Sequence, residues 1–134
     1  MKNCLLLCTA LTLAACSGAK MPSDINEEKV FFAFDSADVT QEMARNLQGQ
    51  SLYMKKHPDI NVTMEGHCDE RGSTEYNLAL GALRAGNAAH VLIKDGIEPS
   101  RVKTISYGKE RPQYFGTGEK VWSKNRNTTT RVDK

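Results

Sequence analysis

Residues 60–96 read INVTMEGHCDERGSTEYNLALGALRAGNAAHVLIKDG, and two periodicities meet in this stretch across a glycine-containing loop. Apolar and polar residues alternate from Ile60 to Met64, which predicts a half-buried strand that ends at Gly66. Helical spacing follows from Ser73 to Lys94, and Asp95-Gly96 is a typical stop for a helix. The stretch therefore predicts a strand, a tight loop and a long helix in succession.

The residues before this stretch predict a similar succession. Val30–Phe34 is a short apolar run, which indicates a buried strand. Asp38 is placed to cap a helix, with Gln41 at its third position, and the helix is expected to end at His57-Pro58. Its core side chains recur at helical spacing and are Met43, Leu47 and Met54.

The residues after the stretch complete the predicted fold. They indicate a strand over Val102–Tyr107, a helical turn over Glu119–Ser123, and a weak, polar last strand over Thr128–Val132. The resulting β-α-β-α-β-(α)-β order implies an α+β fold, a two-layer sandwich with helices on one face of a mixed sheet. The 134 residues suffice for one ordinary domain. A formal net charge of +2 provides no basic field for nucleic acid.

The N-terminus has the features of a secretory signal. Met1-Lys2-Asn3 is a short basic start, and the apolar run from Cys4 to Ala15 is too short to span a bilayer. Leu13-Ala14-Ala15-Cys16 resembles a bacterial lipobox. This resemblance implies a signal peptide over residues 1–15, cleavage before Cys16, and lipid on that cysteine. A plain signal peptide that happens to end at a cysteine is the alternative.

The expected lipid anchor defines the rest of the organisation. Residues 16–29 are small, polar and interrupted by Pro22, so we expect a lipidated N-terminus followed by a flexible tether, with the folded domain over residues 30–134. Ser17 stands where an aspartate would retain a bacterial lipoprotein in the inner membrane. This favours the outer membrane, with the domain facing the periplasm.

The loop 65–73, EGHCDERGS, raises the question of chemistry. His67, Cys68 and Asp69 are consecutive, so their side chains point to opposite faces and do not converge on a metal ion. Cys68 lacks an imidazole placed to activate it as a nucleophile, and a small, partly buried thiol is the expected state. His67 is expected to make a structural hydrogen bond where strand meets loop. We therefore expect no catalytic residue, no metal and no cofactor.

The same loop favours recognition of a small ligand. Asn77, Gly81, Arg84 and Ala88 share one stripe of the helix, and a glycine between two polar residues would leave room beside it. The neighbouring stripe is expected to be core and consists of Tyr76, Leu80, Leu83 and Val91. Asp69 and Arg84 then suit the ammonium and the carboxylate of a zwitterion. A simple Asp69–Arg84 salt bridge is the alternative.

Four segments together carry a family resemblance: VFFAFDSADV (30–39), EGHCDERGSTEYNLALGALRAGNAAHVLIKDGI (65–97), SYGKERP (106–112) and SKNR (123–126). With the lipobox, they resemble the peptidoglycan-associated lipoproteins of the Tol–Pal system, which belong to the OmpA C-terminal-like family. The resemblance implies an OmpA-like domain that binds the peptidoglycan stem peptide at meso-diaminopimelate. It also implies TolB and the other Tol proteins as partners, with a role in envelope integrity and cell division.

The resemblance assigns site residues position by position. Asp69 and Arg84 match the ligand-holding pair, while Asp35 and Asn77 match positions that line the same pocket. The sequence departs from the family where Cys68 replaces threonine, Leu83 replaces arginine and Ala33 replaces an acid. Asn127-Thr128-Thr129-Thr130-Arg131 replaces a usually apolar run. We therefore expect the last strand to be frayed or at an edge of the sheet, without a ligand contact from a second arginine after Arg126.

Two other functions fit parts of the sequence. An OmpA-like wall anchor without Tol partners would keep the same pocket and the same lipid. A thiol- or metal-dependent cell-wall hydrolase would use Cys68 and would require a nucleophile, a base and an orienting group, which the spacing does not supply.

Overall fold

The computed structural model describes residues 19–134, so the predicted signal peptide (1–15) and the lipidated Cys16 lie outside the described residues. The described elements are β1 (Lys29–Phe31), α1 (Gln41–Lys56), β2 (Val62–His67), α2 (Thr74–Lys94), a 3₁₀ turn (Pro99–Arg101), β3 (Val102–Gly108), α3 (Glu119–Asn125) and β4 (Asn127–Val132). The order of elements and the α+β class are as predicted. No helix in residues 19–134 combines the length and apolar character needed to cross a membrane.

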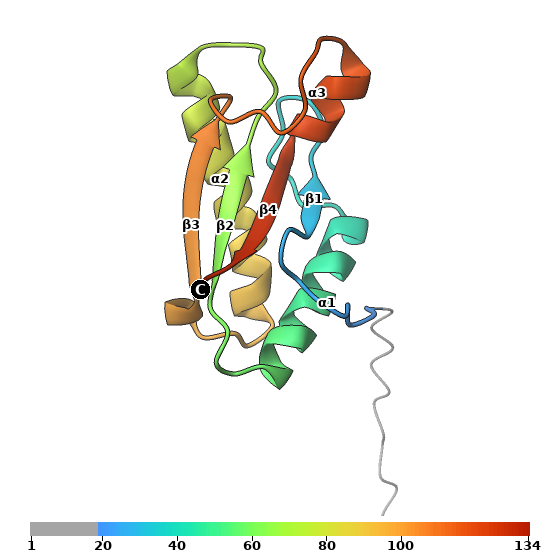
Figure 1. The fold of residues 1–134 in the computed structure, drawn as a ribbon, viewed down its shortest axis with the longest axis vertical. Helices are drawn as coiled ribbons and strands as arrows, with labels where there is room; N and C mark the ends of the chain where they lie inside the picture. The colour runs from blue at the N-terminus through green and yellow to red at the C-terminus, as the bar shows by residue number, and fades with distance from the viewer. Residues whose placement is uncertain (1–18) are drawn as a thin grey trace, which may run out of the picture.

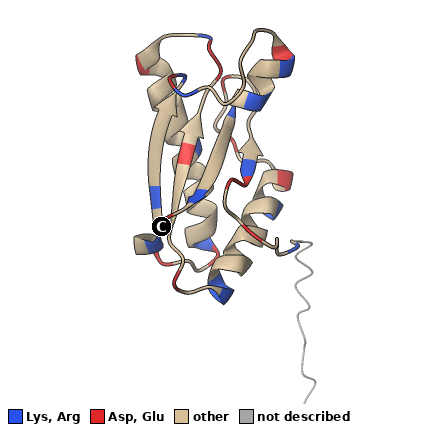
Figure 2. Cartoon of the chain, in the orientation of Figure 1, with Lys and Arg blue, Asp and Glu red and all other residues tan. Residues whose placement is uncertain are grey.

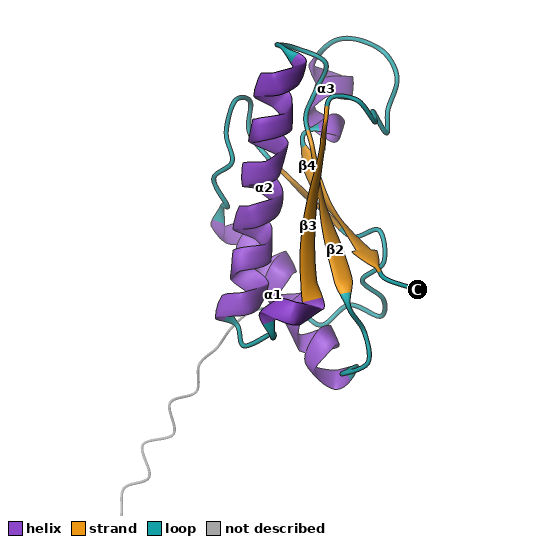
Figure 3. Cartoon of the chain, turned by 90° about the vertical axis from the view of Figure 1, so that its left-hand side faces the viewer, coloured by secondary structure: helices purple, strands orange, loops and turns teal. Residues whose placement is uncertain are grey.

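The four strands form one mixed sheet in the order β1-β4-β2-β3 (Figure 1). β2 and β3 pair in parallel, because α2 returns the chain to the starting edge between them, whereas β4 pairs antiparallel with both β1 and β2. Figure 3 shows α1 and α2 on one face of the sheet, as expected for a two-layer sandwich. The two layers bury the core between them.

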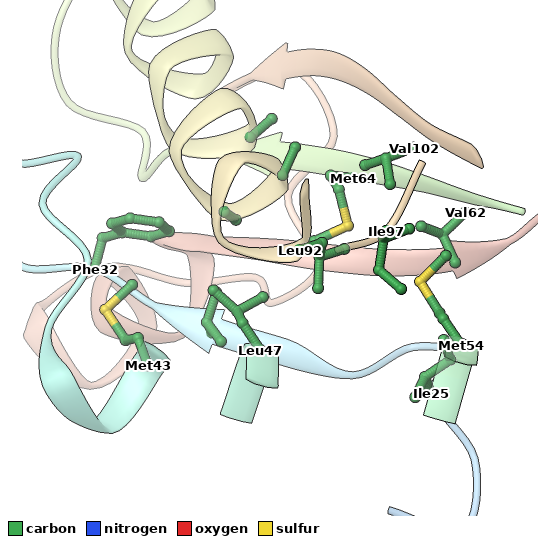
Figure 4. Close-up of a cluster of buried hydrophobic side chains, with 14 residues drawn as sticks. Ile25, Phe32, Met43, Leu47, Met54, Val62, Met64, Leu92, Ile97 and Val102 are labelled. Atoms are coloured by element: carbon green, nitrogen blue, oxygen red, sulfur yellow. The ribbon is translucent and has the colours of Figure 1, made fainter. Parts of the chain in front are cut away.

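The core lies between the sheet and the two long helices (Figure 4). Met43, Leu47 and Met54 of α1 are buried there, which confirms the predicted stripe. They meet Met64 of β2 and Leu92 of α2, both fully buried. Burial of this apolar surface, at about 25 cal/mol per Å², is what joins the layers.

The ends of α2 are as predicted, but the start of α1 is not. Ser73 caps α2 by accepting a hydrogen bond from the Tyr76 N–H at 3.1 Å. α1 is capped by Thr40, which has extended backbone and accepts from the Met43 N–H at 3.3 Å, so the expected Asp38 cap is wrong. The reason is local, since the Asp38 N–H bonds to the Ser36 hydroxyl and Asp38 stays in the loop.

The face of α2 that packs on the sheet is the polar and small stripe, contrary to the prediction. Tyr76 and Leu83 are 52% and 59% exposed, whereas Asn77 and Arg84 are buried. The cause is a close approach of two backbones: a Cβ at Gly66 would lie 1.8 Å from the Gly81 carbonyl oxygen. Strand β2 and Ser106 of β3 therefore fill the space beside Gly81 that the sequence suggested for a ligand.

Strand β4 is polar but lies inside the sheet, so its expected edge position is wrong. Asn127–Thr130 are all buried. The Thr130 hydroxyl donates to the Gln50 side-chain oxygen at 2.6 Å, and the Asn127 amide donates to Gln113 Oε1 at 3.0 Å and to the Lys124 carbonyl at 2.8 Å. Side chains from distant segments thus replace the apolar contacts that a buried strand normally makes.

The folded domain begins before residue 30. Ile25 is fully buried in the core, and β1 spans Lys29–Phe31 rather than the predicted 30–34. The Glu27 N–H donates to the Thr130 carbonyl, and the Thr130 N–H donates to the Glu28 carbonyl, both at 2.8 Å. Because these bonds extend the β1–β4 pairing backwards, residues 25–29 belong to the domain and not to the expected tether.

Candidate functional site

A cavity of about 220 Å³ opens where the N-terminus of α2 meets the loops after β1 and β2. All four predicted site residues line it, namely Asp35, Asp69, Asn77 and Arg84, together with Phe34, Cys68, Arg71, Gly72, Tyr76 and Leu80. Figure 2 shows residues of both charge signs in the loops and in α3 at this end of the molecule. The fold thus gathers four separate sequence positions into one charged hollow.

Asp69 is 5% exposed, and its carboxylate accepts hydrogen bonds from two arginines. Arg71 donates from Nε to Oδ1 at 3.1 Å and from Nη2 to Oδ2 at 2.9 Å, and its backbone N–H reaches Oδ1 at 3.1 Å. Arg126 Nη1 lies 3.5 Å from Oδ2. Burial alone would raise the pKa of Asp69, but the bonds from Arg71 and then Arg126 hold it below its ordinary value.

The alternative of an Asp69–Arg84 salt bridge is therefore wrong, because other arginines take the carboxylate. Within the described part of the chain, no carboxylate forms an ion pair with Arg84. Its guanidinium instead donates to three backbone carbonyls, those of Ser36 at 2.8 Å, His67 at 3.0 Å and Ala33 at 3.1 Å. Arg84 thus joins the loops after β1 and β2.

Arg84 is also a buried charge without an ion pair in the described residues, although the nearby Asp69 carboxylate acts on it electrostatically. It is only 1% exposed, and burial lowers its pKa from the ordinary value. Three of the five guanidinium N–H groups are used by the carbonyls, and the Cys68 side chain is a further neighbour of the guanidinium. A positive charge in this position favours an anion in the cavity.

Arg71 is the residue of the site that sequence reasoning missed. Its guanidinium lies between two aromatic rings, 4.0 Å from the ring centre of Phe34 and 4.1 Å from that of Trp122. The Trp122 Nε1–H donates to Glu70 at 2.8 Å, which fixes the indole of the chain's single tryptophan. The available signals were an arginine next to two acids and the single tryptophan. Arg71 and Trp122 are about fifty residues apart, so no sequence pattern indicated that they meet.

Arg126 and Glu119 form a second charged pair beside this cluster. Arg126 Nη2 lies 2.5 Å from Glu119 Oε1, and Arg126 Nε donates to the Phe32 carbonyl at 3.0 Å. The bond to Glu119 raises the pKa of Arg126 and, in turn, lowers the pKa of Glu119. Glu119 therefore keeps Arg126 in place at the start of β4.

Asn77 and Asp35 contribute in different ways. The Asn77 side-chain amide donates to the carbonyls of Arg71 at 2.8 Å and Ser73 at 2.9 Å, so it holds the loop that leads into α2. Asp35 is exposed at the rim, with a positive φ of 52°, and accepts a hydrogen bond from the Tyr76 hydroxyl. That bond raises the pKa of Tyr76. Asn77 shapes the cavity, and Asp35 offers it a carboxylate.

Cys68 and His67 do not form a reactive pair. The buried Cys68 thiol donates to the Asn77 carbonyl at 3.3 Å, and burial raises its pKa, so the thiol stays protonated. His67 is buried without the expected hydrogen bond, because neither ring nitrogen has a partner, and burial lowers its pKa. Residues 19–134 contain no cluster of three side chains suited to a metal ion.

Comparisons with known proteins agree with this architecture. The model of the OmpA family matches residues 31–126. The chain is 40% identical over 118 residues to the peptidoglycan-associated lipoprotein of Agrobacterium fabrum, which covers 87% of this chain and 67% of that protein. It is also 40% identical over 95 residues to the protein of that name from Legionella pneumophila, over 71% of this chain and 54% of the other.

Two solved structures resemble the fold. The crystal structure of the peptidoglycan-associated lipoprotein from Burkholderia pseudomallei has a TM-score of 0.77 and 36% identity, over 80% of this chain and 91% of that one. The C-terminal domain of Helicobacter pylori MotB has a TM-score of 0.74 over 80% of this chain and 84% of that one. At 21% identity, the second likeness concerns the fold alone.

Proposed function

The chain belongs to the OmpA family, among the peptidoglycan-associated lipoproteins, and from this we propose that it tethers the outer membrane to the cell wall. The relatives are named for association with peptidoglycan, which is a binding role. This chain is a binding protein of that kind and not an enzyme. A buried, protonated Cys68 also leaves a hydrolase without a nucleophile.

The proposed ligand is the peptidoglycan stem peptide at meso-diaminopimelate, whose side chain ends in an ammonium and a carboxylate. The observation that carries this proposal is the buried charge of Arg84 beside the carboxylate of Asp69 in one cavity. Asp69 would receive the ammonium, and the guanidinium of Arg84, together with that of Arg71, would receive the carboxylate. Asp35 would add a second acceptor at the rim, and Asn77 would hold the loop.

The proposed anchor is lipid on Cys16 after removal of residues 1–15. Ser17 directs the protein to the outer membrane in this proposal, and two or three acyl chains, at about 0.8 kcal/mol per buried CH₂, would make the attachment stable. Because Ile25 is packed in the core, and the Lys20 carbonyl and Pro22 lie against Gly49 of α1, the tether consists of residues 16–19. Four extended residues reach about 14 Å at most, so the domain would stay close to its membrane.

The proposed partners are TolB and the other Tol proteins, which would couple this tether to envelope integrity and cell division. Cofactors and nucleic acid have no part in the proposal. A wall anchor that works without Tol partners is the second candidate, and it would use the same cavity. Co-purification of TolB with the detergent-solubilised protein separates the two candidates, since only the first predicts recovery of TolB.

Titration calorimetry tests the ligand. The full chain, purified in detergent, is titrated with a stem peptide that contains meso-diaminopimelate, next to Asp69→Asn and the matched control Asp59→Asn. Charge-assisted hydrogen bonds contribute about 1.5–3 kcal/mol each, so Asp69→Asn should weaken binding by about tenfold or more. Asp59 is exposed beyond the far end of α1 and should not matter. Equal affinity in all three proteins, or none in the parent, would sink the proposal.

A further inference from the structure

The cation position at Asp69 is already occupied by a group of the same chain. Arg71 pairs with both carboxylate oxygens through Nε and Nη2. A ligand ammonium therefore reaches Asp69 only after Arg71 has released it, since the remaining approach is taken by Arg126. The inference drawn here rests on the function proposed above and concerns which ligands can complete this exchange.

Arg71 is the arginine of the site that can move. Its side chain is 32% exposed, whereas those of Arg126 and Asp69 are 7% and 6% exposed. Arg84 is fixed by three backbone carbonyls, and Arg126 by Glu119 and the Phe32 carbonyl. Among the described residues, the other carboxylate in ion-pair range of the Arg71 guanidinium is that of Glu119, at 3.9 Å.

The two aromatic rings would keep a displaced Arg71 at the mouth of the cavity. The guanidinium is stacked between Phe34 and Trp122, and cations retain affinity for ring faces after they lose an ion-pair partner. The Arg71 carbonyl is held by the Asn77 amide at 2.8 Å, so the backbone stays in place. When a ligand displaces Arg71 from Asp69, the guanidinium thus loses its carboxylate partner but stays at the mouth of the cavity.

This arrangement distinguishes two kinds of ligand. A simple amine would replace one cation by another at Asp69 and leave the Arg71 guanidinium without its carboxylate, so little is gained. A zwitterion brings a new carboxylate with its ammonium. Both Asp69 and Arg71 then regain a partner of opposite charge, in the planar geometry that a guanidinium prefers.

We propose that Arg71 is the selectivity-determining residue of the cavity. It competes with simple amines for Asp69, and it exchanges Asp69 for the ligand's carboxylate when a zwitterion enters. The site therefore accepts the diaminopimelate type of side-chain end and rejects the lysine type, which has an ammonium without the adjacent carboxylate.

The test compares affinities for two stem peptides that differ only at this residue, one with meso-diaminopimelate and one with lysine. Calorimetry uses the full chain in detergent, as parent, Arg71→Ala and Arg71→Lys. The control is Arg111→Ala, because Arg111 also stacks on an aromatic ring, Tyr107 at 4.2 Å, but does not line the cavity. The readout is the ratio of the two affinities, which a merely structural loss would not change.

In the parent we expect the diaminopimelate peptide to bind at least about tenfold more tightly than the lysine peptide. Arg71→Ala should lower this ratio severalfold, by strengthening the lysine peptide and weakening the other, and the preference that remains is due to Arg84. Arg71→Lys should give an intermediate ratio, because a lysine keeps the charge without the planar fork. Arg111→Ala should keep the parent ratio.

Three results would overturn the inference, and they differ from a failure of the proposed function. If the parent binds the diaminopimelate peptide and Arg71→Ala shows the same ratio of affinities, the proposed function holds but Arg71 does not determine selectivity. An equal loss of ratio in Arg111→Ala also contradicts a specific role of Arg71. A parent that binds neither peptide contradicts the proposed function itself, and the inference with it.

Discussion

Strand β4 and the ligand cavity both bury polar side chains, but they satisfy them in different ways. In β4, the side chains of Asn127, Thr129 and Thr130 are neutral and find hydrogen-bond partners within the domain. At the cavity, Asp69 shares its charge with the partly exposed Arg71, whereas Arg84 makes no ion pair within the described residues and donates to neutral backbone carbonyls. The hydrogen bonds of these β4 side chains are thus made within the domain, whereas the cavity keeps charge that a ligand can neutralise.

This difference separates structure from function in the domain. A neutral, satisfied network costs little to bury and specifies which segments meet, so it serves a strand at the centre of a sheet. A buried charge without a counter-charge is stabilised by any anion that arrives. Buried polar groups alone therefore do not indicate a binding site. Buried charge that is only partly neutralised does indicate one.

The largest expected effect comes from removing Arg84. Arg84→Ala removes the donor of the Ser36, His67 and Ala33 carbonyls and should lower the free energy of unfolding by about 3 kcal/mol, measured by urea denaturation. Binding of the stem peptide should be lost as well. Arg101 also joins backbone carbonyls, those of Met54, His57 and Ile60, at the far end of the sheet. If Arg101→Ala, still folded, loses as much binding, Arg84 has no electrostatic role at the cavity.

A smaller effect is expected inside β4. Thr130→Val leaves Gln50 Oε1 without its donor and should lower the free energy of unfolding by about 1–2 kcal/mol, with stem-peptide binding unchanged. Thr128→Val is the matched control on the same face, because the Thr128 hydroxyl has no partner in the described structure. That variant should be as stable as the parent or slightly more stable. Equal destabilisation by both valines would mean that shape and not hydrogen bonding holds β4.

The smallest effect concerns His67, which is buried without compensation but carries no charge. Its pKa is lowered by burial from the ordinary 6.5, so below that pH the unfolded chain binds a proton that the folded chain does not. Stability should therefore fall as the pH drops from 6.5 towards the lowered pKa of the folded state. In thermal or urea unfolding across this range, His67→Gln should flatten the slope, and His90→Gln, on the exposed face of α2, should keep it. A slope that persists in His67→Gln places the titration elsewhere.

Sequence reasoning succeeded where local chemistry decides the outcome. The bounds of α2 follow from Ser73 at one end and Asp95-Gly96 at the other, and the periodicity of α1 identified its core residues. Sequence reasoning failed where the structure of a segment depends on contacts with another segment of the chain. The polar side chains of β4 find partners in Gln50 of α1 and in Gln113 of the loop before α3, which no local pattern connects with them.

For the cavity, too, some features were predicted from the sequence and others were not. Four of its lining residues, Asp35, Asp69, Asn77 and Arg84, were predicted from spacing and family resemblance, and the structure brings them to one cavity. The pairing of Asp69 with Arg71 was not predicted. A loop can fold Arg71 back onto a residue two positions away, and periodicity describes only helices and strands. The buried face of α2 was misassigned since the contact between Gly66 and Gly81 reverses the usual preference for large apolar residues.

The early entry of the chain into the sheet has a mechanical consequence for a tether. The segment from Ile25 leads through β1 directly to the loop at Ala33–Ser36, whose carbonyls Arg84 holds beside the cavity. A pull between membrane and wall would therefore run along the short strand β1, beside β4 (Figure 1). The backbone bonds from Glu27 to Phe32 cross that direction and would be strained together, in shear, whereas peeling would break them one after another. Under tension, release of the ligand from the cavity would thus precede unfolding of the domain.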